Sequence, residues 1–246
     1  MDFFKSLFVW LTGVFFIILF FPLTFLVWLV TLPADRNRII THRILTWQSR
    51  LLAKIVPIWK INVRGREKAN GKGPYVFISN HQSILDILLI NSLCLNYKWV
   101  SKIENMNVPF LGWYLRMADY LTVDRGNKES KELMMDKALG CLKKGISVMM
   151  FPEGTRSVDR EIGFFKRGAF QLAIDAGVPI IPILLDGSGG VLPKHGLIFS
   201  TGHKVRMEVF DPVAPDSFGT DNPDILSVKF SNFMKERLAG WRTEKS

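Results

Sequence analysis

The sequence predicts an α/β fold in which helices flank a largely parallel or mixed sheet, with an apolar helical segment at its N-terminal end. Three observations support this prediction. A long uncharged run follows Lys5, a basic amphipathic stretch comes after it, and short β-rich runs then alternate with helical patterns. Such alternation is typical of βαβ units, whose parallel strands are covered by helices.

The apolar segment comes first. No residue between Lys5 and Asp35 is charged, and this run exceeds the ~18 residues that indicate a candidate spanning helix. Pro22 falls inside it, which leaves either a kinked span or two shorter pieces that enter and leave the same leaflet. A secretory signal is the alternative, but its apolar core is roughly 7–15 residues long and ends at a small-residue cleavage site, which the run does not have. We therefore expect a retained membrane segment.

A basic stretch follows the apolar segment. Between Arg36 and Arg66 the chain has eight basic residues and no acidic ones. Apolar residues recur there at steps of three and four, as in a helix with one apolar stripe: Ile40, Ile44, Trp47, Leu51 and Ile55. This pattern favours an anionic phospholipid membrane as partner, although a domain helix with a solvated basic face would show it too. If the first segment spans the membrane, the basic residues after it place the main domain on the cytoplasmic face of that membrane. In a bacterium this would be the inner membrane.

The remainder of the chain predicts the sheet and its helices. Candidate strands are Lys60–Val63, Tyr75–Ser79, Trp99–Ser101, Tyr120–Val123, Ser147–Phe151, Ile180–Leu185 and Val205–Phe210. Helical patterns fall at Ile84–Cys94, Ser130–Lys143, Arg167–Ala176 and Ile225–Leu238. We divide the chain into two parts. Residues 1–57 form the membrane anchor and the basic amphipathic helix, and residues 58–246 form the α/β domain. Functional sites in such sheets lie beyond the carboxyl ends of the strands.

The composition limits the classes of function. With 48% apolar and 22% charged residues, the 246-residue chain is not disordered. Only the net charge of +10 suggests a nucleic-acid binder. We expect no nucleic acid as partner, because no nucleic-acid motif is present and the basic excess lies beside the apolar segment. Cys94 and Cys141 lack metal or disulfide spacing, and neither a nucleophile elbow nor a P-loop occurs.

The first candidate for chemistry is the segment from Asn80 to Asp86. His81 and Asp86 are five residues apart, which on a regular helix separates them by about 140°. They can pair only if His81 lies in a loop and Asp86 in the first turn of the next helix. The Ser83-x-x-Asp86 pattern resembles a capping box and supports that helix start. It also supports the simpler alternative, in which Asp86 only caps the helix and His81 is an ordinary loop residue.

Cations follow three other predicted strands. The segment Phe151–Ser157 places Gly154, which permits close backbone approach, beside Arg156, whose donors suit a phosphate or carboxylate. A surface turn with an ion-paired arginine is the alternative. Arg125 and Lys102 also follow strands. The sequence therefore predicts three cations at the same edge of the sheet.

The order of these motifs resembles that of the 1-acyl-sn-glycerol-3-phosphate acyltransferase family, the lysophosphatidic acid acyltransferases. The family's N-H-x-x-x-x-D block matches Asn80, His81 and Asp86, and its D-R block matches Asp124-Arg125. Its F-P-E-G-T-R-S block matches residues 151–157, and its V-P-x-x-P block matches residues 178–182. One departure is Asp119, at a position where the family commonly has glycine, so the turn at that point is left open.

The resemblance implies a glycerolipid acyltransferase-like fold and a specific reaction. The enzyme would transfer an acyl chain from acyl-CoA or acyl-carrier protein to the sn-2 hydroxyl of lysophosphatidic acid, forming phosphatidic acid in phospholipid biosynthesis. By matched position, His81 and Asp86 would be the catalytic pair. Substrate-binding residues would be Arg125, Glu153, Gly154, Thr155 and Arg156, with Lys102 as a helper.

The reaction implied by this resemblance needs no metal and no cofactor. A histidine base would act directly on the lipid hydroxyl, and no acyl-enzyme intermediate would form. Two alternatives stay open: an acyltransferase for another lysolipid, such as lyso-ornithine lipid, and a non-enzymatic membrane-binding module. The second explains the N-terminal segments but not the polar clusters at the strand ends.

Overall fold

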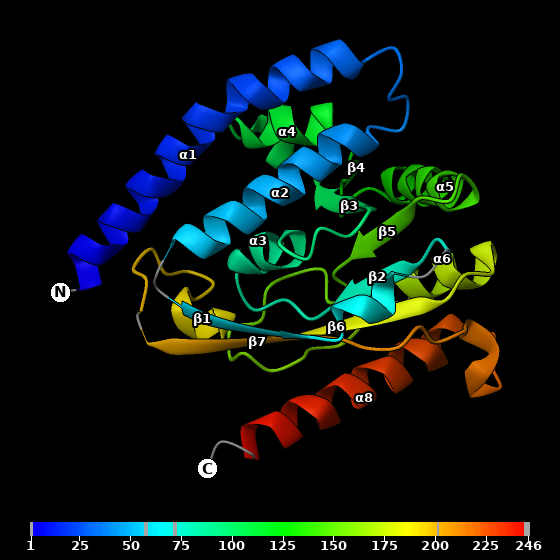
Figure 1. The fold of residues 1–246 in the computed structure, drawn as a ribbon. Helices are drawn as coiled ribbons and strands as arrows, with labels where there is room; N and C mark the ends of the chain where they lie inside the picture. Colours follow the sequence, from blue (N-terminus) through cyan, green and yellow to red (C-terminus); the bar gives the residue numbers. More distant parts are fainter. Residues whose placement is uncertain (1, 57–58, 71–72, 201, 244–246) are drawn as a thin grey trace.

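The computed structural model describes residues 2–56, 59–70, 73–200 and 202–243 (Figure 1). Within these residues the strands form one sheet in the order β1-β7-β6-β2-β5-β3-β4. Their bounds are β1 (Trp59–Arg64), β2 (Val76–Ser79), β3 (Tyr97–Lys102), β4 (Leu121–Val123), β5 (Ser147–Met150), β6 (Ile180–Asp186) and β7 (His203–Val209). Each predicted strand is found, with ends that differ by at most a few residues.

The sheet is largely parallel, as predicted, with a reversed pair at one edge. Strands β6, β2, β5, β3 and β4 run in the same direction. Strand β7 pairs antiparallel with β6, and β1 pairs parallel with β7. Every residue of β2 and β6 is buried, which explains why these strands are continuous apolar runs rather than alternating ones.

Helices cover both faces of the sheet. Their bounds are α1 (Asp2–Thr31), α2 (Ile39–Ile55), α3 (Leu85–Asn91), α4 (Leu111–Met117), α5 (Lys128–Lys143), α6 (Gly168–Ala176), α7 (Ser188–Val191) and α8 (Pro223–Thr243). Short 3₁₀ turns are η1 (Arg66–Ala69), η2 (Ile103–Asn107) and η3 (Pro215–Phe218). The four helices predicted for the α/β domain are present, and the structure adds α4 and α7, which the sequence patterns did not indicate.

Each face of the sheet has its own apolar core. Phe165, Phe170 and Phe230 pack with helices α5, α6 and α8 on one face. Phe77 and Leu89 belong to the core on the other face, beneath α1, α2 and α3. Because side chains alternate along a strand, β2 contributes to both cores. In Figure 1, α1 and α2 accordingly lie on one side of the sheet and α8 on the other.

Helix α1 continues through Pro22 as one 30-residue helix, so the alternative of two shorter pieces is not what the structure shows. At a rise of 1.5 Å per residue it is about 45 Å long. Trp10 Nε1 donates to the Leu197 carbonyl oxygen at 2.8 Å, and Phe21 contacts Phe110 and Trp113 further along the helix. The helix therefore lies against the domain at two separate points.

The apolar stripe of α2 is only partly covered: Ile44 and Leu51 are half-buried, and Trp47 contacts Phe20 of α1. Ile40, Trp47 and Ile55 are all exposed, whereas the buried face carries Thr41, His42, Leu45, Thr46, Gln48 and Ala53. Helix α1 has the length and composition of a membrane span, and only 11% of its most apolar window is buried. The outer surface of α1 is therefore apolar and largely uncovered in the described structure, and that of α2 combines exposed apolar residues with the cations Arg43, Arg50 and Lys54. The boundary predicted at 57/58 lies outside the described residues.

Candidate active site

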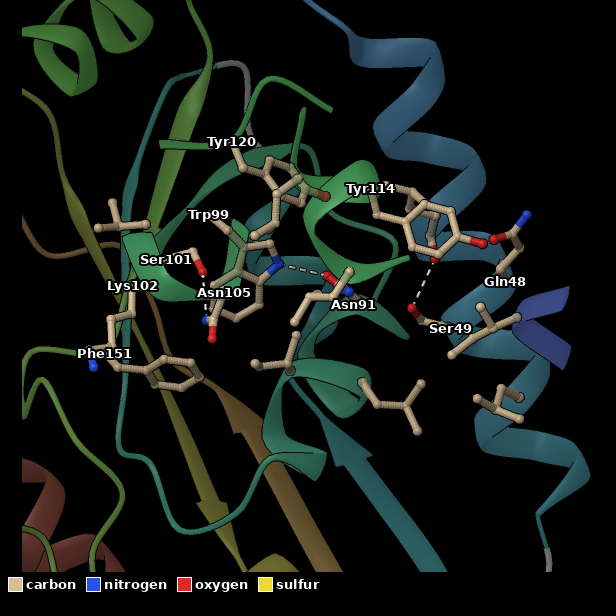
Figure 2. A pocket seen from close by; sticks show the side chains of 18 of the residues that line it. Gln48, Ser49, Asn91, Trp99, Ser101, Lys102, Asn105, Tyr114, Tyr120 and Phe151 are labelled. Atoms are coloured by element: carbon tan, nitrogen blue, oxygen red, sulfur yellow. Dashed lines mark hydrogen bonds between the residues drawn. The ribbon is translucent and has the colours of Figure 1, made fainter. Parts of the chain in front are cut away.

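The site lies at the carboxyl ends of β2, β3, β4 and β5. A cavity of about 260 Å³ opens there between the sheet edge and helices α2, α3 and α4. His81, Lys102, Arg125 and Phe151 are among its lining residues. Figure 2 shows Phe151 and Lys102 at one end of the cavity and Gln48, Ser49 and Tyr114 at the other, beside α2. The strand ends therefore supply one end of an elongated, mainly apolar cavity.

His81 and Asp86 face each other. The distance from His81 Nδ1 to Asp86 Oδ2 is 2.9 Å, and their side chains are 13% and 0% exposed. An ionised carboxylate only accepts hydrogen bonds, so the imidazole proton belongs on Nδ1. The other ring nitrogen, Nε2, is then unprotonated and can accept a proton from a ligand in the cavity.

The backbone around Asp86 explains how two residues five apart can meet. Helix α3 begins at Leu85, so His81 lies in the preceding loop. Asp86 Oδ2 also accepts from the backbone N–H groups of Gln82 and Ser83 at 2.7 and 2.8 Å. The carboxylate thus reaches back to Ser83, as one half of the predicted capping box would. The Ser83 hydroxyl instead donates to the Leu192 carbonyl oxygen at 2.7 Å.

The segment after β5 is attached to His81 through its backbone. Glu153 Oε1 accepts from His81 N–H at 2.8 Å, and Ser157 N–H donates to the His81 carbonyl oxygen at 2.8 Å. Glu153 Oε2 accepts from Gly163 N–H at 3.0 Å. Burial raises the pKa of Glu153, while these two backbone donors act in the opposite direction. Both carboxylate oxygens are thus engaged with the chain itself.

Phe151 fixes the plane of the histidine ring. The two rings are stacked, with centroids 3.9 Å apart and an interplanar angle of 8°. Trp99 also stacks on Phe151, with ring centroids 5.3 Å apart. The imidazole is therefore held by a carboxylate at one edge and by an aromatic ring on one face.

The predicted cations divide into two groups. Lys102 and Arg125 line the cavity, and Lys102 Nζ is 2.6 Å from Glu104 in an exposed ion pair. Partial burial lowers the pKa of Arg125 below its usual value, and the nearby Glu104 carboxylate acts in the opposite direction. Arg156 is half-buried in the adjoining loop and is not among the cavity-lining residues.

The remaining residues of the third block shape the loop. Gly154 has a φ of +70°, a conformation that favours glycine, and a Cβ there would lie 3.0 Å from Lys166 Nζ. Thr155 is exposed beside it. No group of three or more His, Cys, Asp or Glu side chains within the described ranges is arranged to hold a metal ion.

Asp119, the one departure from the family pattern, has a φ of +51°. This is the left-handed region, where glycine is favoured and aspartate is among the residues best tolerated. The turn therefore keeps the conformation that a glycine would adopt. It precedes β4 and leads the chain toward Arg125.

Sequence reasoning missed the polar residues under the cavity. His42 Nδ1 is 2.7 Å from the hydroxyl of Tyr120, and its Nε2 is 2.8 Å from the Leu95 carbonyl oxygen. Asn91 Oδ1 accepts from Trp99 Nε1 and from the Tyr97 hydroxyl, each at 2.9 Å. Neither His42 nor Asn91 belongs to a motif, and no local pattern distinguished them from the other polar residues of α2 and α3.

The chain has an acyltransferase domain, and the histidine–carboxylate pair, the flanking cations and residues of the cavity wall lie within it. The family model described as Acyltransferase matches residues 60–186, which include His81, Lys102, Arg125 and Phe151. Similar proteins of known name indicate which acyltransferase family this is. The chain is 38% identical over 160 residues to a chloroplastic 1-acyl-sn-glycerol-3-phosphate acyltransferase of Arabidopsis thaliana, covering 65% of this chain and 45% of that protein.

A second relative matches over more of its own length. The chain is 30% identical over 193 residues to the 1-acyl-sn-glycerol-3-phosphate acyltransferase of Salmonella typhimurium, covering 77% of this chain and 78% of that protein. The chain belongs to the 1-acyl-sn-glycerol-3-phosphate acyltransferase family. It spans about half the length of the plant and algal relatives that it matches.

A solved structure shows the same fold. The crystal structure of the 1-acyl-sn-glycerophosphate (LPA) acyltransferase from Thermotoga maritima aligns with a TM-score of 0.79 at 23% identity, covering 100% of this chain and 96% of that one. The alignment therefore includes helices α1 and α2 as well as the α/β domain.

Proposed function

We propose that this protein transfers an acyl chain from an acyl thioester to the sn-2 hydroxyl of lysophosphatidic acid, forming phosphatidic acid. The observation that carries this proposal is the His81–Asp86 pair, 2.9 Å apart, at the cation-flanked end of an apolar cavity. The names of the relatives support the same acceptor. Acyl-CoA and acyl-carrier protein are the two candidate donors.

His81 acts as the general base in this proposal. Its Nε2 accepts the proton of the lipid hydroxyl as the hydroxyl oxygen attacks the thioester carbonyl carbon. The carbon–sulfur bond then breaks, and the leaving thiolate takes the proton back from the imidazolium. Asp86 holds the tautomer and stabilises the imidazolium, so the substrate hydroxyl takes the place that serine has in a Ser-His-Asp triad.

The cations hold the glycerol phosphate. Arg125 and Lys102 line the cavity close to His81 and can form charge-assisted hydrogen bonds with a phosphate. Arg156 lies in the loop that is hydrogen-bonded to the His81 backbone. It does not line the cavity, so it would reach the phosphate from beyond the cavity wall. Glu153, Gly154 and Thr155 shape this loop in our proposal, because the Glu153 oxygens already accept backbone donors.

The cavity holds an acyl chain. Its wall away from the strand ends is formed by apolar side chains of four helices, among them Phe16, Leu45, Leu88 and Leu115. Removing an acyl chain from water in such an environment is favourable by about 0.8 kcal/mol per CH₂ group.

Helices α1 and α2 would place this cavity at the membrane. Helix α1 contacts the domain near Trp10 and again near Phe21, so it cannot cross a bilayer alone while the domain stays in water. We infer that α1 and the exposed stripe of α2 lie in one leaflet of an anionic membrane, with the basic residues of α2 near the phosphates. The basic stretch after α1 favours the cytoplasmic leaflet.

Turnover by the purified full-length protein tests the proposal. Lysophosphatidate is offered with a series of acyl-CoA and acyl-carrier-protein donors, and other lysolipids serve as alternative acceptors. We expect phosphatidic acid from lysophosphatidate, and a fall of about 10²–10⁴-fold in rate for His81→Ala, the usual contribution of a positioned base. The control His195→Ala should keep its rate. Near-normal turnover by His81→Ala would rule out the base assignment, and preference for another lysolipid would reject the acceptor.

A further inference from the structure

Asn91 is a polar residue in a mainly apolar part of the cavity wall. It is the last residue of α3, and it lines the cavity together with Ile87 and Leu88 of the same helix. Ile87 and Asn91 are four residues apart, so they project from the same face of α3. Figure 2 shows the Asn91 amide between Trp99 and the α2 side of the cavity. A ligand that fills the cavity therefore contacts this amide.

Two donors fix the orientation of the Asn91 amide. Its Oδ1 accepts from the Tyr97 hydroxyl and from Trp99 Nε1, each at 2.9 Å. An indole N–H can only donate, so the atom of the amide that faces Trp99 must be its oxygen. Tyr97 and Trp99 are buried, and a turned amide would leave the indole donor without an acceptor, which costs free energy. The amide nitrogen accordingly points away from Trp99 (Figure 2).

The nitrogen of this amide is not used by the protein. Among the residues that the structure describes, no group accepts a hydrogen bond from Asn91 Nδ2. The other amides that line the cavity differ, because Gln48 Nε2 donates to the Thr24 hydroxyl oxygen at 2.7 Å and Asn105 Nδ2 to the Ser101 hydroxyl oxygen at 3.0 Å. Asn91 Nδ2 is also not one of the fully buried atoms without a partner. It is therefore accessible at the cavity surface.

Folding explains only the oxygen of this side chain. Trp99 and Tyr97 need an acceptor at this place, and an aspartate would supply one equally well. The amide nitrogen, in contrast, adds a donor to a mainly apolar wall. When a hydrocarbon chain displaces water from the cavity, a donor without a partner is unfavourable. The ligand that occupies the cavity should therefore carry an acceptor oxygen next to Asn91.

Asn91 is close to the reacting groups. It follows Asp86, the partner of His81, by five residues, which is about 7.5 Å along the axis of α3. The rings of His81, Phe151 and Trp99 contact each other in series, and Trp99 is hydrogen-bonded to Asn91. A saturated acyl chain has no acceptor oxygen other than its carbonyl oxygen, which lies at the reacting end of the chain. The position of Asn91 therefore suits an acyl carbonyl.

We propose that Asn91 Nδ2 donates a hydrogen bond to the carbonyl oxygen of an acyl group in the cavity and thereby fixes how deeply this group enters. The inference rests on the proposed acyl transfer, and it adds a substrate-binding residue that lies outside the motifs. Two acyl groups can supply the carbonyl, namely the sn-1 ester of lysophosphatidate and the thioester of the donor. In either case the protein distinguishes an acyl group from an alkyl group.

Binding of analogues without the carbonyl tests the proposal without turnover. An ether replaces the sn-1 ester in 1-O-alkyl-glycerol 3-phosphate, and a thioether replaces the thioester in S-alkyl-coenzyme A. Each analogue is paired with its acyl counterpart, and one ligand at a time is titrated into the full-length protein in detergent by calorimetry. In one pair, we expect the wild type to bind the acyl ligand about 3–10-fold more tightly, the contribution of one hydrogen bond.

Asn91→Asp removes the donor and keeps an acceptor for Trp99 and Tyr97. In this variant the preference for the acyl ligand should be lost. Asn96→Asp, which changes an exposed asparagine just before β3, is the matched control and should keep the preference. The pair that loses its preference in Asn91→Asp identifies the source of the carbonyl. Loss in the lysophosphatidate pair indicates the sn-1 ester, and loss in the coenzyme A pair indicates the thioester.

Two results would overturn the proposal. The first is equal affinity of the wild type for both ligands of both pairs, which depends on no variant. The second is a preference that persists in Asn91→Asp, since another group would then hold the carbonyl. An Asn91-dependent preference in a protein that does not acylate lysophosphatidate would contradict the proposed function and leave the role of Asn91 supported. Acylation of lysophosphatidate without that preference would support the proposed function and overturn the role of Asn91.

Discussion

At the scale of single residues, Asp86 shows how the site is prepared before substrate arrives. Its Oδ2 accepts from His81 Nδ1 and from two backbone N–H groups. The carboxylate is fully buried and cannot turn without breaking all three bonds. The imidazole is thereby fixed relative to α3, and geometry of this kind can supply a large part of a rate enhancement.

Glu153 connects two motifs, and its charge state matters. In Glu153→Gln, one of the two backbone donors, His81 N–H or Gly163 N–H, would face an amide N–H₂ group. We expect a loss of about 1–3 kcal/mol in the free energy of unfolding, because a buried donor is left unsatisfied, together with a lower kcat. Denaturant unfolding and initial rates measure both effects. Glu236→Gln, an exposed glutamate on α8, should change neither.

Arg125 and Arg156 differ in their access to the cavity, and we expect them to differ in effect. Arg125→Ala should raise KM for lysophosphatidate about 10–100-fold, because a charge-assisted contact to phosphate is lost. Arg156→Ala should raise the same KM by less, since Arg156 does not line the cavity. Steady-state kinetics over a range of lysophosphatidate concentrations compares them, with exposed Lys128→Ala as control. An unchanged KM in Arg125→Ala would remove it from the phosphate site.

At the scale of elements, α2 is attached to the domain by polar contacts. The buried His42 imidazole contacts Tyr120 and the Leu95 carbonyl oxygen. Burial lowers the pKa of His42 to about 4 from its usual value of 6.5, although the hydrogen bond to Leu95 acts in the opposite direction. Between these two pH values the unfolded chain binds a proton that the folded chain does not. Stability is therefore complete above pH ~6.5 and falls as the pH decreases toward 4.

The expected loss is about 3 kcal/mol across that interval, from 1.36 kcal/mol per pKa unit. Thermal unfolding of the wild type and of His42→Gln at pH 7 and pH 4.5 measures it. The variant lacks the titrating group, so its melting temperature should fall less on acidification. A parallel fall in both proteins would show that other groups cause the acid sensitivity.

The elements that could be predicted are those with a clear period or a buried apolar run. All strands and the longer domain helices meet that condition, whereas α4 does not, because Leu111–Met117 is short and includes Gly112 and Arg116. Periodicity identified the stripe of α2 but not its direction. A repeat shows which residues share a face, and only the tertiary fold shows that the most buried face of α2 is the one that carries His42 and Gln48 together with Leu45.

Less of the site could be predicted. The motif spacing indicated that His81 and Asp86 could pair, and the structure places them in contact. The hydrogen bonds of Glu153 to His81 and Gly163 join segments far apart in sequence, and no local pattern contains that information.

At the scale of the whole molecule, the position of α1 predicts its topology in a membrane. Both ends of α1 should lie on the side that holds the α/β domain. Single cysteines at Phe4, Arg36 and Lys137, in a protein whose Cys94 and Cys141 are replaced by serine, can be treated with a membrane-impermeant thiol reagent in vesicles of known orientation. We expect all three to be modified from the same side. Modification of Phe4→Cys from the opposite side would show that α1 crosses the bilayer.

Phe16 and Ile17 of α1 form part of the cavity wall together with residues of α2 and α4. A protein shortened by its first helix to make it easier to purify would therefore lose more than its attachment to lipid. The cavity proposed for the acyl chain would be open to water on the side of α1, and its wall would no longer limit the length of the chain in the same way. Chain-length selectivity measured on such a fragment would describe a different enzyme.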